Sequence, residues 1–428
     1  MAGPRAKRGG PKRNRGQATM QTGDSELMRA INRFHVLDAI RRFEPISRVE
    51  IGERTRLSRA TVSAITADLI EEGLLSADEG EPGATAARGR PRVMLRMNPQ
   101  AAHVVGVKLS MHQVSISVTN LKAEVLTALT LPVRPRRLEA EVVADLLEDG
   151  IRSTVAKAGL DMAGIAGIGI GIPGFIDAMA GVVQWSPIFG QGPLPFAAMV
   201  GRRLGVSAVI ENDANLVTLA ERWFGHGQDV DNFVVVTVEH GVGMGLFLGG
   251  ELYRGHHGMG AEFGHTKHDR QGPPCRCGQR GCVEAYAADY AILRDAQRLL
   301  DFADIEDDAV AERTIRQVTE LARAGDAGLQ ALFARAGEVL GLGIANVVNV
   351  LDPARIIVSG GGVRAGDLFG PALREAVEAN VLRSLAGRCQ VVIHDWGDEV
   401  WARGAASLVL QGLYRAPWSR GARIEMAV

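Results

Sequence analysis

One pattern constrains the fold of this sequence more than any other, because a set of strands and helices occurs twice along the chain. The first copy begins at His103 and the second near Phe233. In the first copy, periodicity predicts strands at 104–109, 113–119 and 125–133, an amphipathic helix at 139–158 and a buried glycine-rich strand at 164–174. The second copy starts with strands at 234–238 and 243–249. Two such units predict a duplicated α/β fold that closes on a central cleft.

A separate helical unit precedes the duplicated part. Apolar residues recur at spacings of three and four over residues 25–43, and the two following helices are predicted at 48–56 and 58–69. Ser47 with Glu50 forms a capping-box pattern, and Ser58 is positioned to cap the third helix. The outward face of the third helix carries small residues, which allow close approach to base edges in the major groove. We therefore predict a recognition helix whose DNA contacts are Arg59, Thr61 and Ser63.

A basic hairpin is predicted after these helices. A polar, glycine-rich segment leads to the sequence RGRPR at 88–92 and then to an alternating strand at 93–97. Arg90 and Arg92 at its tip would lie beside phosphates or in the minor groove. A helical triplet alone is also found in ordinary surface subdomains. The helices, cap, small exposed face and basic tip together favour a winged helix-turn-helix DNA-binding domain at residues 25–98.

The charge is unevenly distributed, although the net charge of the 428 residues is only −1. Residues 1–23 contain six Lys and Arg and no acid, interleaved with Gly and Pro, so residues 1–24 are predicted to be a disordered basic arm. This arm either adds salt-dependent affinity for DNA or is a solvated extension, and Met20 is an alternative start. No signal peptide or long uninterrupted apolar stretch is present, so we expect a cytoplasmic protein without a membrane partner.

Three of the four cysteines lie in one short segment. Cys275, Cys277 and Cys282, with His265 ten residues upstream, form the ligand set of a closed tetrahedral zinc site. The alternative is three reduced thiols in a loop. A metal is favoured because this Gly- and Arg-rich segment has little else to order it, so we predict Zn as the cofactor.

Four segments resemble a known family. They are GIGIGIPGFID at 167–177, ENDANLVTLAERWFGHG at 211–227, GAEFGHTKHD at 260–269 and CRCGQRGCVEAYAA at 275–288. This chain resembles the ROK family of repressors, open reading frames and sugar kinases. The resemblance implies an actin-like (ribonuclease H-like) sugar-kinase fold in two lobes at residues 99–428. Within the family, the winged unit is typical of the repressor branch, which includes xylose, glucose and N-acetylglucosamine regulators. A homodimer or higher homo-oligomer is implied.

The resemblance also implies a sugar site. Its contacts fall on Asn212, Asp213, Glu262, His265 and Glu284. Carboxylates suit this task, because each buried sugar hydroxyl needs a hydrogen-bond partner. Taken alone, Asn212 and Asp213 are better explained as a helix cap, and Glu284 could be a surface acid. Their joint occurrence with the cysteine motif favours the site.

The positions that hold ATP in the family's kinases are altered here. Lys108 stands where those kinases have a carboxylate, and Ser110 and Met111 replace two glycines. At a second turn, Glu239 and His240 bring an anion close to where phosphates would lie. We therefore predict no catalytic residues and a sugar-responsive repressor that binds an operator in double-stranded DNA. A bifunctional sugar kinase ranks second, and a sugar-binding scaffold that does not bind DNA ranks third.

Overall fold

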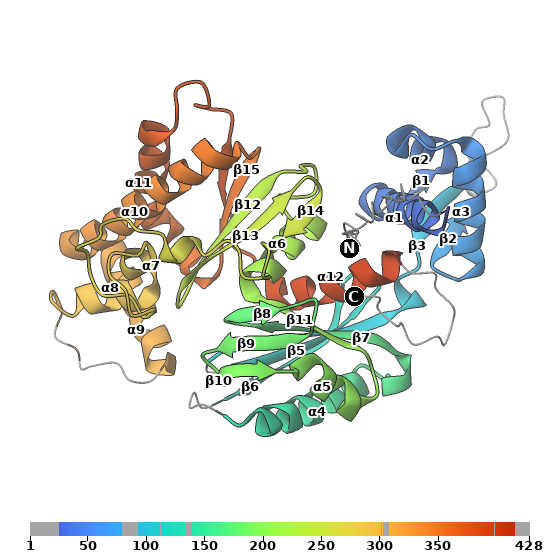
Figure 1. The fold of residues 1–428 in the computed structure, drawn as a ribbon, viewed down its shortest axis with the longest axis horizontal. Helices are drawn as coiled ribbons and strands as arrows, with labels where there is room; N and C mark the ends of the chain where they lie inside the picture. Colours follow the sequence, from blue (N-terminus) through green and yellow to red (C-terminus); the bar gives the residue numbers. More distant parts are fainter. Residues whose placement is uncertain are drawn as a thin grey trace, which may run out of the picture.

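The structure is a computed structural model, which describes residues 25–78, 93–111, 113–133, 138–300, 302, 308–397 and 399–415 (Figure 1). It contains a small N-terminal unit and two larger lobes, each built on a five-stranded sheet. The predicted basic arm and the wing tip with Arg90 and Arg92 lie outside the described residues.

The N-terminal unit has the predicted three helices and a small sheet. Its elements are α1 (Ser25–Phe43), β1 (Ile46–Ser47), α2 (Arg48–Thr55), α3 (Arg59–Glu71), β2 (Leu75–Asp78) and β3 (Met94–Met97). The strand order is β1-β3-β2, with both pairs antiparallel. The predicted capping box is present, since the Glu50 amide donates to Ser47 Oγ at 3.4 Å and the Ser47 amide to Glu50 Oε2 at 2.9 Å. This is a winged helix-turn-helix, as predicted.

The first lobe follows directly. Its main elements are β4 (His103–Leu109), β5 (Gln113–Asn120), β6 (Val125–Pro132), α4 (Ala140–Lys157), β7 (Ile165–Ile172), α5 (Phe196–Leu204) and β11 (Ala208–Asn212). The strand order is β11-β7-β4-β5-β6: β4, β5 and β6 form an antiparallel meander, while β7 and β11 extend the sheet in parallel. A second small sheet contains β8 (Phe175–Asp177), β9 (Val182–Ser186) and β10 (Gly190–Leu194).

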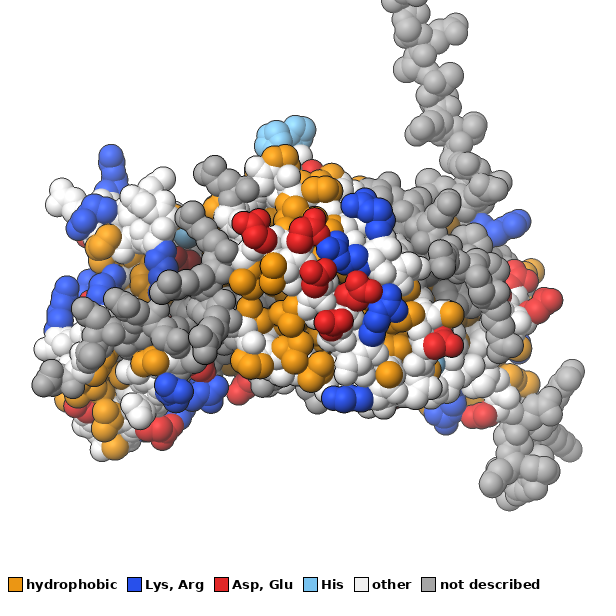
Figure 2. Space-filling view, turned by 90° about the horizontal axis from the view of Figure 1, so that it is seen from below, with side chains coloured by type: hydrophobic (Ala, Val, Ile, Leu, Met, Phe, Trp, Pro, Cys, Tyr) orange, Lys and Arg blue, Asp and Glu red, His pale blue; other side chains and the backbone are white. Residues whose placement is uncertain are grey.

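Helices α4 and α5 cover the outer face of this lobe (Figure 1). Seen from below, the surface mixes acidic, basic and apolar side chains (Figure 2). Arg203 of α5 pairs there with Glu141 and Asp145 of α4. The described charges on this face therefore have both signs, unlike a basic surface for nucleic acid.

The second lobe repeats the topology of the first. It is reached through α6 (Asp213–Phe224), and its strands are β12 (Phe233–Val238), β13 (Val242–Leu248), β14 (Glu251–Tyr253), β15 (Arg355–Ser359) and β16 (Gln390–Ile393). Their order, β14-β13-β12-β15-β16, again combines an antiparallel meander with two parallel strands. The predicted duplication is thus confirmed. The helical layer contains η3 (Phe263–His265), α7 (Glu284–Ala287), α8 (Asp289–Ala296), α9 (Asp308–Arg323), α10 (Ala327–Leu351), η4 (Gly361–Ala365) and α11 (Gly366–Asn380).

Helix α10 is the one described helix that is long and apolar enough to cross a membrane. More than half of its apolar window is buried, and Phe333, Leu340 and Ile344 belong to the core of the second lobe. The core helix of a soluble protein has the same composition, so α10 is weak evidence for a membrane span.

The last helix, α12 (Glu399–Arg415), returns from the second lobe to the sheet of the first. Glycines of the first sheet allow it to approach closely. A Cβ on Gly106 would lie 2.6 Å from the Ala402 carbonyl oxygen, and one on Gly169 would lie 2.1 Å from that of Ala405. The alternating glycines of β7 therefore serve helix packing as well as the turn that follows.

Candidate functional site

The cleft residues predicted to contact a sugar begin where β11 ends and α6 starts. Asn212 caps α6, because its Oδ1 accepts the Ala214 amide at 2.9 Å, and its Nδ2 donates to the Gly174 carbonyl at 3.0 Å. Gly174 has φ +119°, and a Cβ there would lie 2.3 Å from the Trp185 carbonyl oxygen. The cap interpretation is therefore correct for Asn212, whose amide also fixes the glycine turn beside Asp213.

Asp213 lies between charged groups from both lobes. Burial raises its pKa, Lys108 of β4 lowers it, and Glu239, which follows β12, raises it. The net shift is upward. Asp213 Oδ1 also accepts the Ala214 amide at 2.9 Å, so the start of α6 orients this carboxylate.

Two further predicted carboxylates lie near Asp213. Burial raises the pKa of Glu262, His265 lowers it, and Asp213 and Glu284 raise it further, so the net pKa is above its ordinary value. Glu284 is 8% exposed, and its Oε2 accepts the Val242 amide at 3.2 Å. The fold thus brings together acids that are far apart in the sequence. Three neighbouring carboxylates can accept several hydrogen bonds from hydroxyl groups.

Glu211 and Arg254 form a contact that the sequence did not reveal. Glu211 is 1% exposed, and it accepts the amides of Asn212 and Asn215, each at 2.9 Å. Its Oε2 accepts Arg254 Nε at 2.7 Å. The Arg254 carbonyl in turn accepts the Gly260 amide at 2.9 Å, closing the loop that leads to Glu262. This ion pair joins the first sheet to the second lobe beside residues predicted to contact a sugar.

The altered phosphate positions meet in a second ion pair between the lobes. Lys108 Nζ lies 3.4 Å from Glu239 Oε2 and 3.6 Å from the centre of the Trp401 ring. Burial raises the pKa of Glu239, but Lys108, His240 and Arg364 lower it more, so the net pKa is below its ordinary value. A Cβ on Gly361 would lie 3.0 Å from Glu239 Oε1. The Glu239 carboxylate therefore lies between Lys108 and the glycine-rich turn after β15.

The other altered residues shape the turn between β4 and β5. Ser110 Oγ donates to the Gln113 carbonyl at 3.0 Å, and Met111 packs against the core of the first lobe. Both side chains therefore have local structural roles at this turn.

The predicted metal ligands converge on one point. The ligand atoms of His265, Cys275, Cys277 and Cys282 all lie within 4.8 Å of one another. Cys277 Sγ and Cys282 Sγ are 3.7 Å apart, as are Cys275 Sγ and His265 Nδ1. Tetrahedral zinc, with sulfurs about 2.3 Å away, would hold two of them about 3.8 Å apart. The donor set and spacing therefore fit a tetrahedral metal site.

The surroundings of the thiols shift the pKa values of Cys275 and Cys277 in opposite directions. Burial raises the pKa of Cys275, whereas the pKa of Cys277 is lowered because the Gln279 amide, the neighbouring thiols and Lys267 outweigh its burial. Lys267 Nζ lies 2.8 Å from Cys282 Sγ. Cys275 Sγ lies 3.5 Å from Glu284 Oε1, so the cluster touches one of the carboxylates of the cleft.

The predicted recognition helix presents the expected face. Arg59 and Ser63 are exposed on α3, while Val62, Ile65 and Leu69 are buried. Thr61 is half-buried, and its Oγ1 lies 2.8 Å from Ser58 Oγ at the cap. Its hydroxyl therefore stabilises the helix start in the free protein.

Known protein families match both parts of this chain. A profile of the ROK family matches residues 104–412, and a MarR-family profile matches residues 30–84. The chain belongs to the ROK family. The DNA-binding unit is shared with its regulators and covers residues outside the ROK match.

Among curated relatives, a putative xylose repressor of Caldicellulosiruptor sp. (strain Rt8B.4) is 29% identical over 411 residues, covering 92% of this chain and 99% of the relative. The xylose repressor of Bacillus subtilis (strain 168) is 28% identical, covering 91% and 98%. The DNA-binding transcriptional dual regulator NagC of Escherichia coli (strain K12) is 27% identical, covering 93% and 96%.

Two solved structures, one of a regulator and one of a kinase, share the fold of this chain. A ROK family transcriptional regulator, a homologue of the E. coli MLC protein, matches with a TM-score of 0.76 and 27% identity, over 91% of this chain and 97% of that chain. A ROK hexokinase from Thermus thermophilus matches with a TM-score of 0.60 and 30% identity, over 71% and 97%. The regulator match includes the winged unit, so this chain is a DNA-binding regulator of the ROK family.

Proposed function

We propose that this ROK regulator is a repressor that responds to a small sugar, and that its ROK domain binds the sugar without phosphorylating it. One combination within the cleft carries this proposal. Asp213, Glu262 and Glu284 lie close together as hydroxyl acceptors, while the Lys108–Glu239 ion pair lies at the positions of the kinase phosphate motifs.

The ion pair is a physical obstacle to ATP. A polyphosphate at this position would meet the carboxylate of Glu239 and would displace it from Lys108. A neutral sugar brings no negative charge to this position. Binding without transfer is therefore the activity favoured by the cleft.

Sugars named for the relatives are the first candidates for the effector, since those proteins are repressors of xylose and N-acetylglucosamine genes by name. A thermal-shift screen with D-xylose, D-glucose and N-acetyl-D-glucosamine tests this, with L-glucose as the stereochemical control. Binding to the folded state raises the melting temperature. The repressor assignment then requires that the same sugar changes the affinity for a duplex from upstream of the protein's own coding sequence.

DNA binding is assigned to Arg59, Thr61 and Ser63 of α3 and to Arg90 and Arg92 of the wing. The exposure of α3 and the MarR-type unit support this assignment. Pairing of two recognition helices on a palindromic operator supports a homodimer. The soluble character of such regulators supports a cytoplasmic location.

Zinc is the metal that we assign to His265 and the three cysteines. Bound through His265 Nδ1, it would leave Nε2 of the same ring free to face the sugar. Closed coordination of this kind supplies structural stability and would fix the loop that follows Glu262 relative to Glu284.

A sugar kinase is the second candidate, because kinases share the fold. The resemblance to the family's kinases also implies that Asp213 stands at the position of their base. Incubation with ATP, magnesium and the sugar panel decides between the two. Sugar-dependent ADP formation at enzyme-like rates would establish the kinase and refute the non-catalytic assignment.

A further inference from the structure

Two helices, α6 and α12, lie between the lobes, and the last turn of each packs against the winged unit (Figure 1). Helix α6 starts at Asp213 and ends at Phe224, a length of about 18 Å. Helix α12 has Trp401 beneath Lys108 near one end and the buried Tyr414 at the other. Any rotation of one lobe against the other must therefore act on these helices.

Helix α6 is packed tightly against both lobes. A Cβ on Gly245 of β13 would lie 3.0 Å from the Ala214 carbonyl oxygen, and one on Gly404 of α12 would lie 2.3 Å from that of Leu216. Close-packed backbones have no slack with which to absorb a displacement. Movement at the cleft end of α6 is therefore passed along the helix.

The far end of α6 lies in the core of the winged unit. Trp223 is 4% exposed and shares a hydrophobic cluster with Val36, Leu37 and Ile40 of α1. The same cluster contains Val62, Ile65 and Leu69 of α3. The core of the DNA-binding unit thus continues into α6 and α12, across the proposed domain boundary at residue 98.

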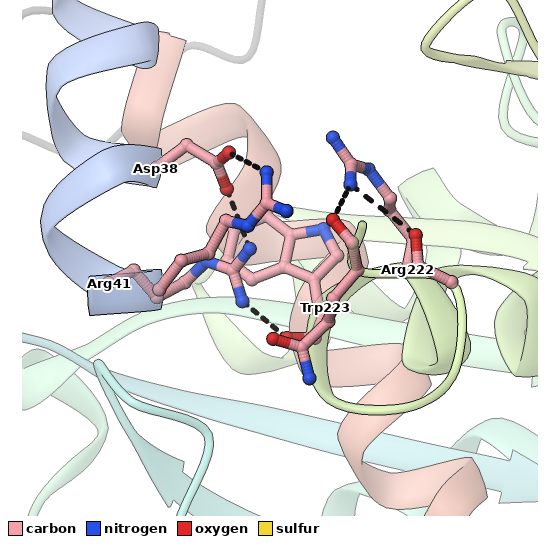
Figure 3. Close-up of polar contacts among 7 residues, drawn as sticks. Asp38, Arg41, Arg222 and Trp223 are labelled. Carbon is pink, nitrogen blue, oxygen red and sulfur yellow. Dashed lines mark hydrogen bonds and ion pairs between the residues drawn. The ribbon is translucent and has the colours of Figure 1, made fainter. Parts of the chain in front are cut away.

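Polar contacts fix Trp223 to α1 (Figure 3). The Arg41 guanidinium lies 4.5 Å from the centre of the Trp223 ring and donates to the Trp223 carbonyl. The Tyr414 ring meets Trp223 edge-on, with centroids 4.9 Å apart. Helix α1 is therefore held to the last turn of α6 by a side chain and by the backbone.

Charges at this junction come from both elements. Asp38 Oδ1 accepts Arg41 at 2.6 Å, and Asp38 Oδ2 accepts Arg42 at 3.5 Å. Burial raises the pKa of Asp38, but Arg41, Arg222 of α6 and Arg42 together lower it below its ordinary value. One carboxylate of α1 thus balances cations on both sides of the contact.

Two buried hydrogen-bond donors at the contact of α1 with α6 and α12 nevertheless have no partner among the described residues. Within the part of the chain that the structure describes, Arg41 Nε and the Tyr414 hydroxyl are buried without a hydrogen-bond partner. Buried donors normally find partners, and leaving them unpaired is unfavourable.

We propose that α6 carries the state of the effector site to the DNA-binding unit, and that Arg41 and Trp223 are the positioning residues at its far end. The proposal rests on the repressor function above. A sugar that draws Asp213 and Glu262 together changes the angle between the lobes, and the last turn of α6 then shifts α1 and, through the shared core, α3.

The test compares Arg41→Met with Arg42→Met, a neighbouring arginine with no Trp223 contact among those described. Operator titrations with and without D-xylose, D-glucose or N-acetyl-D-glucosamine measure the fold-change in operator Kd. Arg41→Met should reduce this fold-change at least fivefold while sugar Kd, measured by calorimetry without DNA, stays within about threefold. Arg42→Met should keep the fold-change within twofold, and Arg41→Lys, which retains a cation over the ring, should restore most of it.

Trp223→Phe and Trp223→Leu provide a second test in case one variant does not fold. The proposal is overturned if folded, sugar-binding Arg41→Met and Trp223→Leu proteins keep the wild-type fold-change. If no sugar alters wild-type operator affinity, the repressor function fails instead. The helix is then tested without sugar by hydrogen exchange: Asp213→Ala should change exchange at residues 36–43 at least twofold, and this change should disappear in Asp213→Ala/Trp223→Leu. Unchanged exchange in Asp213→Ala would overturn the proposal in that case as well.

Discussion

Replacing Lys108 with Met should destabilise the protein by leaving Glu239 without its cation. The Lys108 side chain is 9% exposed and that of Glu239 is 28% exposed. Removing one partner of a fully buried pair costs about 3–5 kcal/mol, and the partial hydration of Glu239 reduces this to about 2–3 kcal/mol. Loss of the cation over Trp401 adds up to about 1 kcal/mol, part of which the Met thioether recovers on the same ring.

The effect should depend on pH with a definite sign. In the wild type the folded-state pKa of Glu239 is below its ordinary value of 4.5, so its contribution to stability is present above that value and is lost as pH falls through the folded pKa. In Lys108→Met the largest opposing charge is gone, so burial, now opposed by His240 and Arg364 alone, should raise the pKa relative to the wild type. The destabilisation should therefore be larger at pH 7.5 than at pH 5, where protonation relieves the buried charge.

A double-variant cycle isolates the pair. Lys108→Met/Glu239→Gln leaves no unpaired charge and should return to within about 1 kcal/mol of the wild type, giving a coupling of about 2 kcal/mol. Urea unfolding followed by tryptophan fluorescence and circular dichroism measures the midpoints, and coincidence of the two probes checks whether the lobes unfold together. Equal stabilities of Lys108→Met and the double variant, or a destabilisation that does not depend on pH, would refute this account of the ion pair.

Three further outcomes are expected. Protein purified without added metal should contain about one zinc per chain by elemental analysis, and Cys277→Ser should lower both zinc content and stability; a full loss of metal with no change in stability would contradict a structural role. Arg59→Ala should weaken binding to a specific operator by about 1–3 kcal/mol. The control, Arg388→Ala, changes an exposed arginine of the second lobe and should leave operator affinity unchanged. Unchanged affinity in Arg59→Ala/Thr61→Ala would remove α3 from the interface. Asp213→Ala should weaken sugar binding about tenfold or more by calorimetry, because a charged hydrogen bond contributes about 1.5–3 kcal/mol.

Local patterns predicted most of the regular elements, because strand alternation and helical periodicity are properties of neighbouring residues. The predicted helix at 25–43 and the strand at 104–109 agree with α1 and β4 to within one residue. The small sheet at 175–194 was not predicted. Its strands are only three to five residues long, and β10 contains glycine and proline, so they have no clear period.

Sequence patterns do not predict contacts between residues that are far apart in the chain. Lys108 and Glu239 were interpreted as two separate losses of a kinase motif, but 131 positions separate two charges that the fold joins into one ion pair. Glu211 was adjacent to the predicted site residues without a signal of its own, since its partner Arg254 lies in the other lobe. Trp223 resembled the end of an ordinary amphipathic helix, because the sequence does not reveal which surface that helix end meets.

The two ion pairs between the lobes explain how a kinase fold can serve a regulator. In a kinase, the lobes close around two ligands, and we propose that the Lys108–Glu239 pair takes the place of ATP here. An internal pair at that position gives the lobes a contact that is independent of nucleotide. The Glu211–Arg254 pair lies on the sugar side, next to Asn212 and the loop that leads to Glu262. A sugar that binds here needs to change the balance between two lobe arrangements by only a few kcal/mol, a range that one or two charged hydrogen bonds supply. Because the winged unit is packed on the helices that connect the lobes, the same small free energy is available at the DNA-binding surface.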